Sequence, residues 1–262
     1  MPETAPAAGL FVAGTDTGVG KTRAAVSIVR ALARRGLVVA AMKPVAAGAV
    51  ATAQGLRNAD AASLAAAASR AAPYELVNPY CLPAAVSPHL AAAEAGIDIE
   101  LTRLAAALRE LGAGADCVIV EGAGGWLAPI GTSLTMADVA DTLELPVLLV
   151  VGLRLGCLSH ALLTARAVRA SGHALAGWIG NRIDPGFERA AENLATLERW
   201  LGAAPIAVLE HAPQAHPHGP AASGLVLEHG AELPDAAVAR LLAALRTTCR
   251  MSDRAGVSFC LE

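Results

Sequence analysis

The sequence predicts an α/β fold in which a mostly parallel sheet carries helices on both of its faces. Two observations support this prediction: apolar runs alternate with stretches of helical spacing, and the alternation begins at a glycine-rich turn between a strand and a helix. This alternation is typical of parallel sheets, in which each strand is followed by a crossover helix. With 262 residues, the chain can bury a large core, and we expect a single domain over residues 1–262.

The first elements surround the glycine-rich turn at residues 14–22. The apolar run from Leu10 predicts a strand, and a helix should follow the turn because Val26, Val29 and Leu32 recur at helical spacing. Arginine residues just before Gly36 are typical of a helix C-terminus. The later strands are expected at residues 37–42, 117–120, 147–151, 178–179 and 206–209, and the later helices at 58–72, 101–111, 158–170, 187–201 and 236–245.

The turn after the first strand resembles a phosphate-binding loop. In such a loop, backbone N–H groups at a helix N-terminus face an anion, a lysine reaches the outer phosphates, and a hydroxyl group ligates magnesium. Gly20, Lys21 and Thr22 occupy those positions. The usual spacing places a glycine where this chain has Thr15, and Gly14 lies one position earlier. Because the turn joins a predicted strand to a predicted helix, we expect a nucleotide site in a P-loop NTPase-like fold.

Lysine occurs only at Lys21 and Lys43, although the chain has 20 basic residues. Lysine carries a compact charge on a flexible stem, whereas the guanidinium of arginine is a wide planar fork. Each lysine follows an apolar run that we expect to be a strand, and ligands of open parallel sheets bind beyond the carboxyl ends of the strands. We therefore expect both lysines at one mouth of the sheet, whereas the alternative for Lys43 is an ordinary lysine that faces solvent.

Other polar residues also follow the predicted strands. Glu121 comes directly after an apolar run, where a carboxylate beside a phosphate loop is suited to hold magnesium. Asp60 is a second candidate, but the residues alone favour an aspartate that stabilises the start of a helix. Asn181 ends another strand with an amide, which can both donate and accept and so match an adenine edge.

The composition argues against several classes of function. The formal net charge is −3 and basic residues are not clustered, which does not suit a nucleic-acid surface. No apolar run reaches the roughly 20 residues that cross a bilayer, and the N-terminus lacks a secretory pattern, so we expect a cytoplasmic protein without a membrane partner. The five cysteines show no Cys-x-x-Cys spacing, so neither a disulfide framework nor a zinc site is indicated.

Several ordered segments together resemble one known family. They are Gly14-Thr-Asp-Thr-Gly-Val-Gly-Lys-Thr22, Lys43-Pro-Val-Ala46, Gly55-Leu-Arg-Asn-Ala-Asp60, Asn78-Pro-Tyr80, Ser87-Pro-His89, Val120-Glu-Gly-Ala-Gly-Gly-Trp126, Leu155-Gly-Cys-Leu-Ser-His-Ala-Leu-Leu-Thr164 and Gly177-Trp-Ile-Gly-Asn181. The family is that of the ATP-dependent dethiobiotin synthetases of biotin synthesis, and the resemblance covers about residues 10–212. Residues 213–262 form a C-terminal extension to which we assign no role.

The resemblance implies an activity and partners. Enzymes of this family are cyclo-ligases that join CO2 to 7,8-diaminononanoate and close a cyclic urea, with ATP as co-substrate and Mg²⁺ as cofactor. The reaction passes through a carbamate and a carbamic-phosphoric anhydride. The family's enzymes are homodimers whose active site lies at the subunit interface, so we expect the same here.

The resemblance also implies roles for individual residues. Lys43 would be the catalytic lysine, and Asp60 would become a magnesium ligand together with Thr22 and Glu121. The nucleotide would be bound by Gly18, Val19, Gly20, Lys21, Thr22, Arg23, Glu121, Gly122, Ala123, Gly124, Asn181, Arg182, Glu210, His211 and Ala212. The diamine would be bound by Thr17, Lys43, Ala47, Leu155, Gly156, Cys157 and Ser159. The loop at 155–159 would come from the partner subunit.

Some positions depart from the family pattern. Gly18, Ala47 and Ser159 stand where some members have glutamate, serine and asparagine, and residues 207–210 lack the usual glycine and proline. The main alternative is a partner-regulated ATPase of the partitioning or cell-division type, which shares the fold. The phosphate loop of those ATPases has an additional lysine where this chain has Asp16. A nucleotide-binding module without enzymatic activity is a further alternative.

Overall fold

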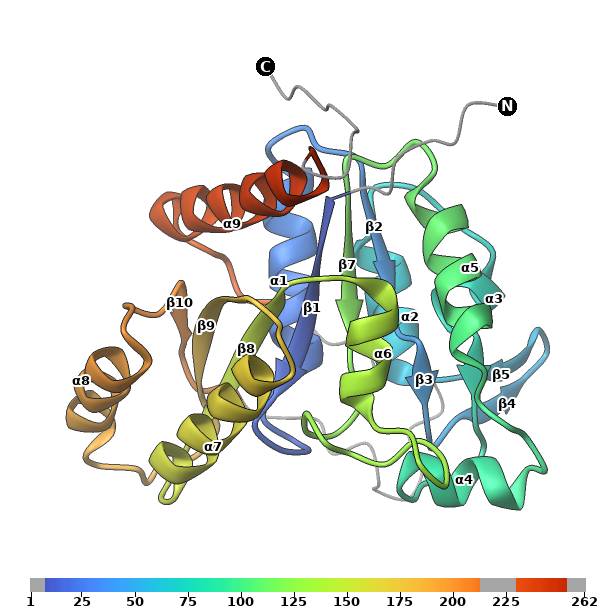
Figure 1. Ribbon diagram of the computed structural model, residues 1–262, viewed down its shortest axis with the longest axis horizontal. Helices are drawn as coiled ribbons and strands as arrows, with labels where there is room; N and C mark the ends of the chain where they lie inside the picture. The colour runs from blue at the N-terminus through green and yellow to red at the C-terminus, as the bar shows by residue number, and fades with distance from the viewer. Residues whose placement is uncertain (1–7, 213–229, 254–262) are drawn as a thin grey trace.

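A six-stranded parallel sheet forms the centre of the molecule (Figure 1). The computed structural model describes residues 8–212 and 230–253, so segments 213–229 and 254–262 of the predicted extension lie outside the described residues. The strands are β1 (Ala8–Gly14), β2 (Val39–Met42), β7 (Cys117–Glu121), β8 (Val147–Leu153), β9 (Leu175–Arg182) and β10 (Ala207–Leu209). Their order in the sheet is β10-β9-β8-β1-β7-β2, and every neighbouring pair is parallel. The predicted fold class is confirmed.

Helices cover both faces of this sheet and bury a separate hydrophobic core on each. Side chains of β1 alternate between the two cores, with Phe11 and Ala13 in one and Leu10 and Val12 in the other. The first core is covered by α5 (Leu101–Gly112), α6 (Met136–Leu143), α7 (Cys157–Ala170) and α8 (Ala190–Leu201). The second core is covered by α1 (Lys21–Ala33), α2 (Ala59–Ala67) and α9 (Asp235–Asp253).

Helix α9 gives a structural role to part of the C-terminal extension. Its Val238, Leu241 and Leu245 are buried in the core that also holds α1. A helix was predicted at residues 236–245, and the structure confirms it and extends it to Asp253.

Two predicted helices have different bounds from those that the sequence suggested. The helix expected at 58–72 ends at Ala67, because Ala68 is extended and the N–H of Ser69 donates to the carbonyl of Val39 at 2.9 Å. The helix expected from residue 187 begins at Ala190, because the N–H of Phe187 closes a turn on the carbonyl of Asp184 at 3.2 Å.

Several short elements were not predicted. They are α3 (Tyr74–Val77), α4 (Pro88–Glu94), α6, the paired strands β3 (Val45–Ala46) and β6 (Tyr80–Cys81), and the paired strands β4 (Val50–Thr52) and β5 (Gly55–Arg57). Most are too short to show a period in the sequence. Helix α6 has a clear local signal, because Thr135 and Asp138 form a capping box at its start.

The order of the strands decides which residues meet at the carboxyl edge of the sheet. Strand β7 lies between β1 and β2, so Glu121 at the end of β7 is flanked by the loop that follows β1 and by Lys43, which follows β2. No described helix combines the length and the apolar character needed to cross a membrane.

Candidate active site

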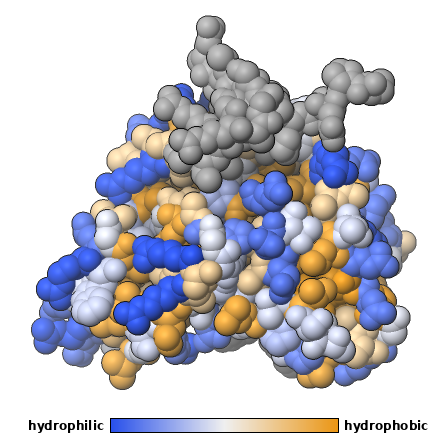
Figure 2. All heavy atoms as spheres, viewed as in Figure 1, coloured by the Kyte–Doolittle hydropathy of each residue, from blue (hydrophilic) through white to orange (hydrophobic). Residues whose placement is uncertain are grey.

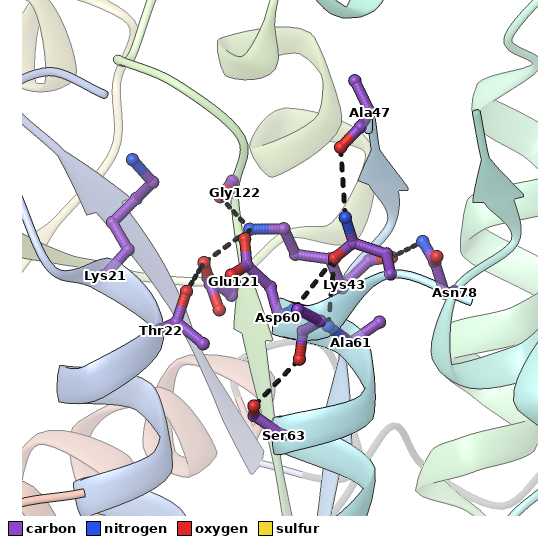
Figure 3. A network of polar contacts seen from close by, with 12 residues as sticks. Lys21, Thr22, Lys43, Ala47, Asp60, Ala61, Ser63, Asn78, Glu121 and Gly122 are labelled. Carbon is purple, nitrogen blue, oxygen red and sulfur yellow. Dashed lines mark hydrogen bonds and ion pairs between the residues drawn. The ribbon is translucent and has the colours of Figure 1, made fainter. Parts of the chain in front are cut away.

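Lys43 lies at the centre of a polar network at the carboxyl edge of the sheet (Figure 3). Its Nζ donates to Oε1 of Glu121 at 2.5 Å and to Oδ2 of Asp60 at 2.9 Å. A third contact, at 3.3 Å, reaches the carbonyl of Gly122. The side chain of Lys43 is only 4% exposed, so the expectation of a site lysine is supported over that of a lysine facing solvent.

The backbone of Lys43 is fixed on both sides. Its N–H donates to the carbonyl of Val77 at 2.7 Å, and its carbonyl accepts from Nδ2 of Asn78 at 2.7 Å. These bonds come from α3 and the residue after it, so this short helix holds the lysine in place.

Glu121 connects Lys43 to the phosphate loop. Its Oε1 accepts from Lys43 and also from Oγ1 of Thr22, the latter at 2.9 Å. Its Oε2 is buried and has no hydrogen-bond partner among the described residues. A buried carboxylate oxygen without a donor is costly unless a further group binds it.

Asp60 lies at a helix start, as the residues alone suggested, and its side chain also reaches the polar network of Lys43. It lies in the first turn of α2, where Asn58 caps the helix by accepting from the N–H groups of Asp60 and Ala61 at 3.0 and 3.3 Å. Its carboxylate also pairs with Lys43. The helix start therefore delivers this carboxylate to the site.

Two glycines of the predicted phosphate loop have a left-handed backbone conformation. Gly18 and Gly20 have φ values of 74° and 87°, which favour glycine. A Cβ atom at Gly20 would lie 2.1 Å from Nδ2 of Asn181. The Nζ of Lys21 donates to the carbonyl of Asp16 at 3.0 Å, and its side chain points away from the Lys43 network (Figure 3).

The same environment moves the pKa values of the two lysines in opposite directions. Burial and the nearby charge of Lys43 lower the pKa of Lys21 to about 8. Burial alone would lower the pKa of Lys43 as well, but Asp60 and Glu121 raise it above its ordinary value. Burial raises the pKa of Glu121, whereas Lys43 holds the pKa of Asp60 below its ordinary value in spite of burial.

The donors around Glu121 fit a divalent cation. Thr22, Asp60 and Glu121 supply a hydroxyl and two carboxylates, and the unpartnered Oε2 of Glu121 could accept a metal ion. Among the described residues there is no cluster of three or more histidine, cysteine or acidic side chains. This donor set suits Mg²⁺, which is usually held by one or two carboxylates and completes its shell with phosphate and water.

The residues predicted to contact the base of the nucleotide form a second group. Asn181 is buried, and its Nδ2 donates to the carbonyl of Val19 at 2.9 Å while its Oδ1 accepts from Arg23 at 3.0 Å. Arg23 also donates to the carbonyl of Glu210 at 2.6 Å. The ring Nδ1 of His211 lies 3.2 Å from the carbonyl of Arg182. The structure therefore brings β9 and the end of β10 to the start of α1.

The residues predicted to bind the diamine lie in two places. Ala47 lies beside the Lys43 network, since its carbonyl accepts from Nδ2 of Asn58 at 3.1 Å (Figure 3). Thr17 is exposed in the phosphate loop. At the start of α7, Leu155, Gly156 and Ser159 are exposed, whereas Cys157 is buried in the first core.

Two features of the site were missed by sequence reasoning. Asn78, which holds the carbonyl of Lys43, was quoted in a motif but given no role. Arg154 pairs with Oδ2 of Asp16 at 2.6 Å and so joins the end of β8 to the phosphate loop. In the sequence, this pair was indicated only by opposite charges that follow two of the predicted strands.

The lysine pKa values can be measured because the chain has only two lysines. In protein that carries ¹³C at the lysine ε-carbon, one signal should titrate near pH 8 and disappear from that position in Lys21→Arg. The other signal, removed by Lys43→Arg, should stay in its protonated position up to at least about pH 10, because both carboxylates favour the charged form. A shared midpoint for the two signals would contradict the geometry described above.

Comparison with solved structures supports the fold alone. The MinD cell division protein of Aquifex aeolicus has a TM-score of 0.51 and 16% identity, with 98% of this chain and 100% of that chain covered. The Signal Recognition Particle 54 kDa protein of Aeropyrum pernix has a TM-score of 0.51 and 17% identity, with 96% of this chain covered. This chain covers 49% of that protein's length.

Comparison of the sequence is more specific. A family model described as an AAA domain matches residues 8–218. The ATP-dependent dethiobiotin synthetase BioD of Aromatoleum aromaticum is 51% identical over 213 residues, which are 81% of this chain and 95% of that protein. The protein of the same name from Pseudomonas paraeruginosa is 50% identical, with 81% and 92% covered. At this identity and coverage, the chain belongs to the family of ATP-dependent dethiobiotin synthetases.

Proposed function

We propose that this chain forms dethiobiotin from 7,8-diaminononanoate, CO2 and ATP in the cytoplasm. The observation that carries the proposal is the buried Lys43 ammonium, which lies between the carboxylates of Asp60 and Glu121 beside a phosphate loop. A fixed positive charge at this place suits a reaction in which negative charge passes from a phosphoryl group to a carbamate. The relatives named above support the identity of the reaction.

The proposed reaction has three steps. One amine of the diamine attacks CO2, a C–N bond forms, and the nitrogen loses a proton to give a carbamate. A carbamate oxygen then attacks the γ-phosphorus of ATP, the bond to the β,γ-bridging oxygen breaks, and ADP leaves. Finally the second amine attacks the carbamoyl carbon, the C–O bond to phosphate breaks, the nitrogen loses a proton, and the ring closes.

The residues of the chain would mainly position these groups. The backbone of residues 18–22 and the side chain of Lys21 would bind the β and γ phosphates. Lys43 would neutralise charge where the γ-phosphate meets the carbamate, which requires an ammonium that stays protonated. Positioning and electrostatic stabilisation account for most of the catalysis of phosphoryl transfer.

A bound Mg²⁺ would neutralise charge on the phosphate oxygens. We propose that Thr22, Asp60 and Glu121 hold it, because their oxygens lie together and one oxygen of Glu121 has no other partner among the described residues. Asn181 would read adenine with the help of its neighbours in the second group of residues. These neighbours are Arg23, Arg182, Glu210, His211 and Ala212. Gly122, Ala123 and Gly124, which follow β7, would line the nucleotide site beside Glu121.

We also propose a homodimer in which the loop at 155–159 reaches the partner's site. Leu155 is 87% exposed, and Leu163, two turns along α7, is 62% exposed. Leu127, beyond the loop that follows β7, is 61% exposed. Figure 2, drawn from the side of α7, shows hydrophobic residues at the surface among hydrophilic ones. Exposed leucines of this kind are typical of a face that a second subunit covers.

The alternative, a partner-regulated ATPase, has support only from the fold. Asp16 stands where such ATPases have a lysine, and its carboxylate accepts from the N–H of Thr17 at 2.7 Å and pairs with Arg154. A carboxylate at this position would repel phosphate, whereas the lysine of those ATPases would bind it. Hydrolysis of ATP without diamine would favour the alternative.

Formation of the cyclic urea tests the proposed function directly. Purified protein with magnesium ATP, bicarbonate and 7,8-diaminononanoate should give dethiobiotin, detected by mass. Lys43→Arg should lower kcat by about 100-fold or more and change the Kd for ATP little, because the wide guanidinium cannot fit between Asp60 and Glu121.

Lys21→Arg is the matched comparison, because it makes the same substitution at the phosphate loop. It should weaken ATP binding as well as turnover. Hydrolysis of ATP at the same rate with and without diamine, and no urea, would contradict the proposed function. Near-normal turnover of Lys43→Arg would contradict the role of Lys43.

Mixed dimers test the shared site. We propose that the loop at 155–159 meets the carboxylate of the substrate, so Ser159→Glu should be inactive because the new charge repels that carboxylate. Lys43→Arg should be inactive in its own site. Unfolding and refolding the two variants together should restore about a quarter of wild-type activity, because half of random dimers are mixed and each mixed dimer has one intact site of two. No recovery, in a mixture shown to contain mixed dimers, would contradict a loop supplied by the partner.

A further inference from the structure

The hydroxyl group of Tyr74 lies behind the active site and joins two asparagine residues. The N–H of Asn58 donates to the Tyr74 oxygen at 2.8 Å, and the hydroxyl donates to Oδ1 of Asn78 at 3.3 Å. The sulfur of Cys81 lies 3.8 Å from the same oxygen. The guanidinium of Arg57 stacks on the ring, 4.1 Å from its centroid. The ring of Tyr74 is therefore held by the stacked arginine, and its hydroxyl group by hydrogen bonds.

Each of the two asparagines continues directly to the site. Asn78 donates its Nδ2 to the carbonyl of Lys43 at 2.7 Å. Asn58 accepts from the N–H of Asp60 at 3.0 Å, and it also donates to the carbonyl of Ala47 at 3.1 Å. One hydroxyl thus connects the backbone that carries Lys43 with the helix start that carries its partner Asp60.

The hydrogen bond from Tyr74 fixes which way the side-chain amide of Asn78 faces. Asn78 can donate to Lys43 only if its amide nitrogen faces that carbonyl, and the hydroxyl bond to Oδ1 favours this orientation. Burial raises the pKa of Tyr74, so the hydroxyl keeps the proton that it donates. Asn58 and Asn78 are buried, at 7% and 2% exposure, so loss of the hydroxyl would leave polar groups without partners in a place that water reaches poorly.

We infer that Tyr74 is a positioning residue, which sets the distance between the Lys43 ammonium and the Asp60 carboxylate through Asn78 and Asn58. The inference rests on the proposed role of Lys43 and adds a residue that touches neither substrate nor nucleotide. A displacement of Lys43 by a fraction of an ångström would slow the transfer step while leaving the phosphate loop intact.

The chain offers a matched control, because it has only one other tyrosine. The oxygen of Tyr80 also accepts from a backbone N–H, that of Glu100 at 2.8 Å, and an arginine stacks on its ring at 4.7 Å. Its hydroxyl, however, supports the start of α5 and makes no hydrogen bond to Asn58, Asn78 or Lys43 in the described part of the chain. Only the backbone carbonyl of Tyr80 contacts the linkage, since it accepts from Nδ2 of Asn78 at 3.2 Å, and the substitution leaves that carbonyl in place. Tyr80→Phe therefore removes a similar hydrogen bond without touching the linkage.

The test compares Tyr74→Phe with Tyr80→Phe in the full-length protein. Tyr74→Phe should lower kcat for urea formation about tenfold, with the Kd for ATP changed less than about twofold. Tyr80→Phe should keep kcat within about twofold of the wild type. Tyr74→Phe should lower the melting temperature more than Tyr80→Phe, because it removes the bond to Oδ1 of Asn78 as well as a bond to a backbone N–H group, whereas Tyr80→Phe removes only the latter kind.

A second measurement separates positioning from loss of stability. In protein with ¹³C at the lysine ε-carbon, Tyr74→Phe should move the Lys43 signal and leave that of Lys21 in place. Tyr80→Phe should move neither. This readout needs no substrate, so it remains informative even if the protein proves to catalyse another reaction.

The outcomes distinguish the inference from the proposed function. If Tyr74→Phe keeps kcat and the Lys43 signal while Lys43→Arg abolishes turnover, the inference is wrong and the function stands. If both tyrosine variants lose activity and melting temperature equally, the hydroxyl of Tyr74 is merely structural and the inference is also wrong. If the wild type makes no urea, the proposed function fails, and the Lys43 signal alone decides the inference.

Discussion

The constraint on which the site depends is a buried positive charge that must have negative partners. Transfer of an ammonium from water to the protein interior costs roughly several kcal/mol of free energy, unless hydrogen bonds and opposite charges replace its hydration. Lys43 meets this requirement with Glu121 on one side and Asp60 on the other. Such clusters seldom add to stability, since apolar replacements are often as stable. The cluster around Lys43 is therefore weak evidence for a gain in stability, and the chemistry of the site is the reason that we propose for it.

The order of the strands makes this cluster possible. Strand β7 is paired with β1 and with β2, and all three run parallel, so their ends bring the phosphate loop, Glu121 and Lys43 to one edge. The third partner, Asp60, arrives from the start of α2 and depends on the cap made by Asn58. The two lysines therefore have different environments in spite of similar burial. Lys21 faces no carboxylate in its hydrogen bonds among the described residues and has a lowered pKa, whereas Lys43 is held charged.

The sequence predicted those features that repeat or that have a fixed spacing. The parallel sheet follows from the alternation of strands and helices, and the positions of Lys21 and Lys43 follow from where strands end. The role of Asp60 could not be predicted from periodicity, because a capped helix start looks the same whether or not a lysine lies opposite. Asn78 and Tyr74 were equally hidden, since their contacts join short segments whose pairing is set by tertiary packing.

The most direct test of this account is the coupling between Lys43 and Glu121 in the free energy of unfolding. Urea unfolding at pH 7 of Lys43→Met, Glu121→Gln and the double variant measures it, because neither substitution needs substrate to show its effect. The account predicts that Lys43→Met costs about 3–5 kcal/mol alone, because it leaves Glu121 buried without its partner, and at least about 1 kcal/mol less when Glu121→Gln is present. Additive effects of the two substitutions would contradict the claim that the buried charges of Lys43 and Glu121 depend on each other.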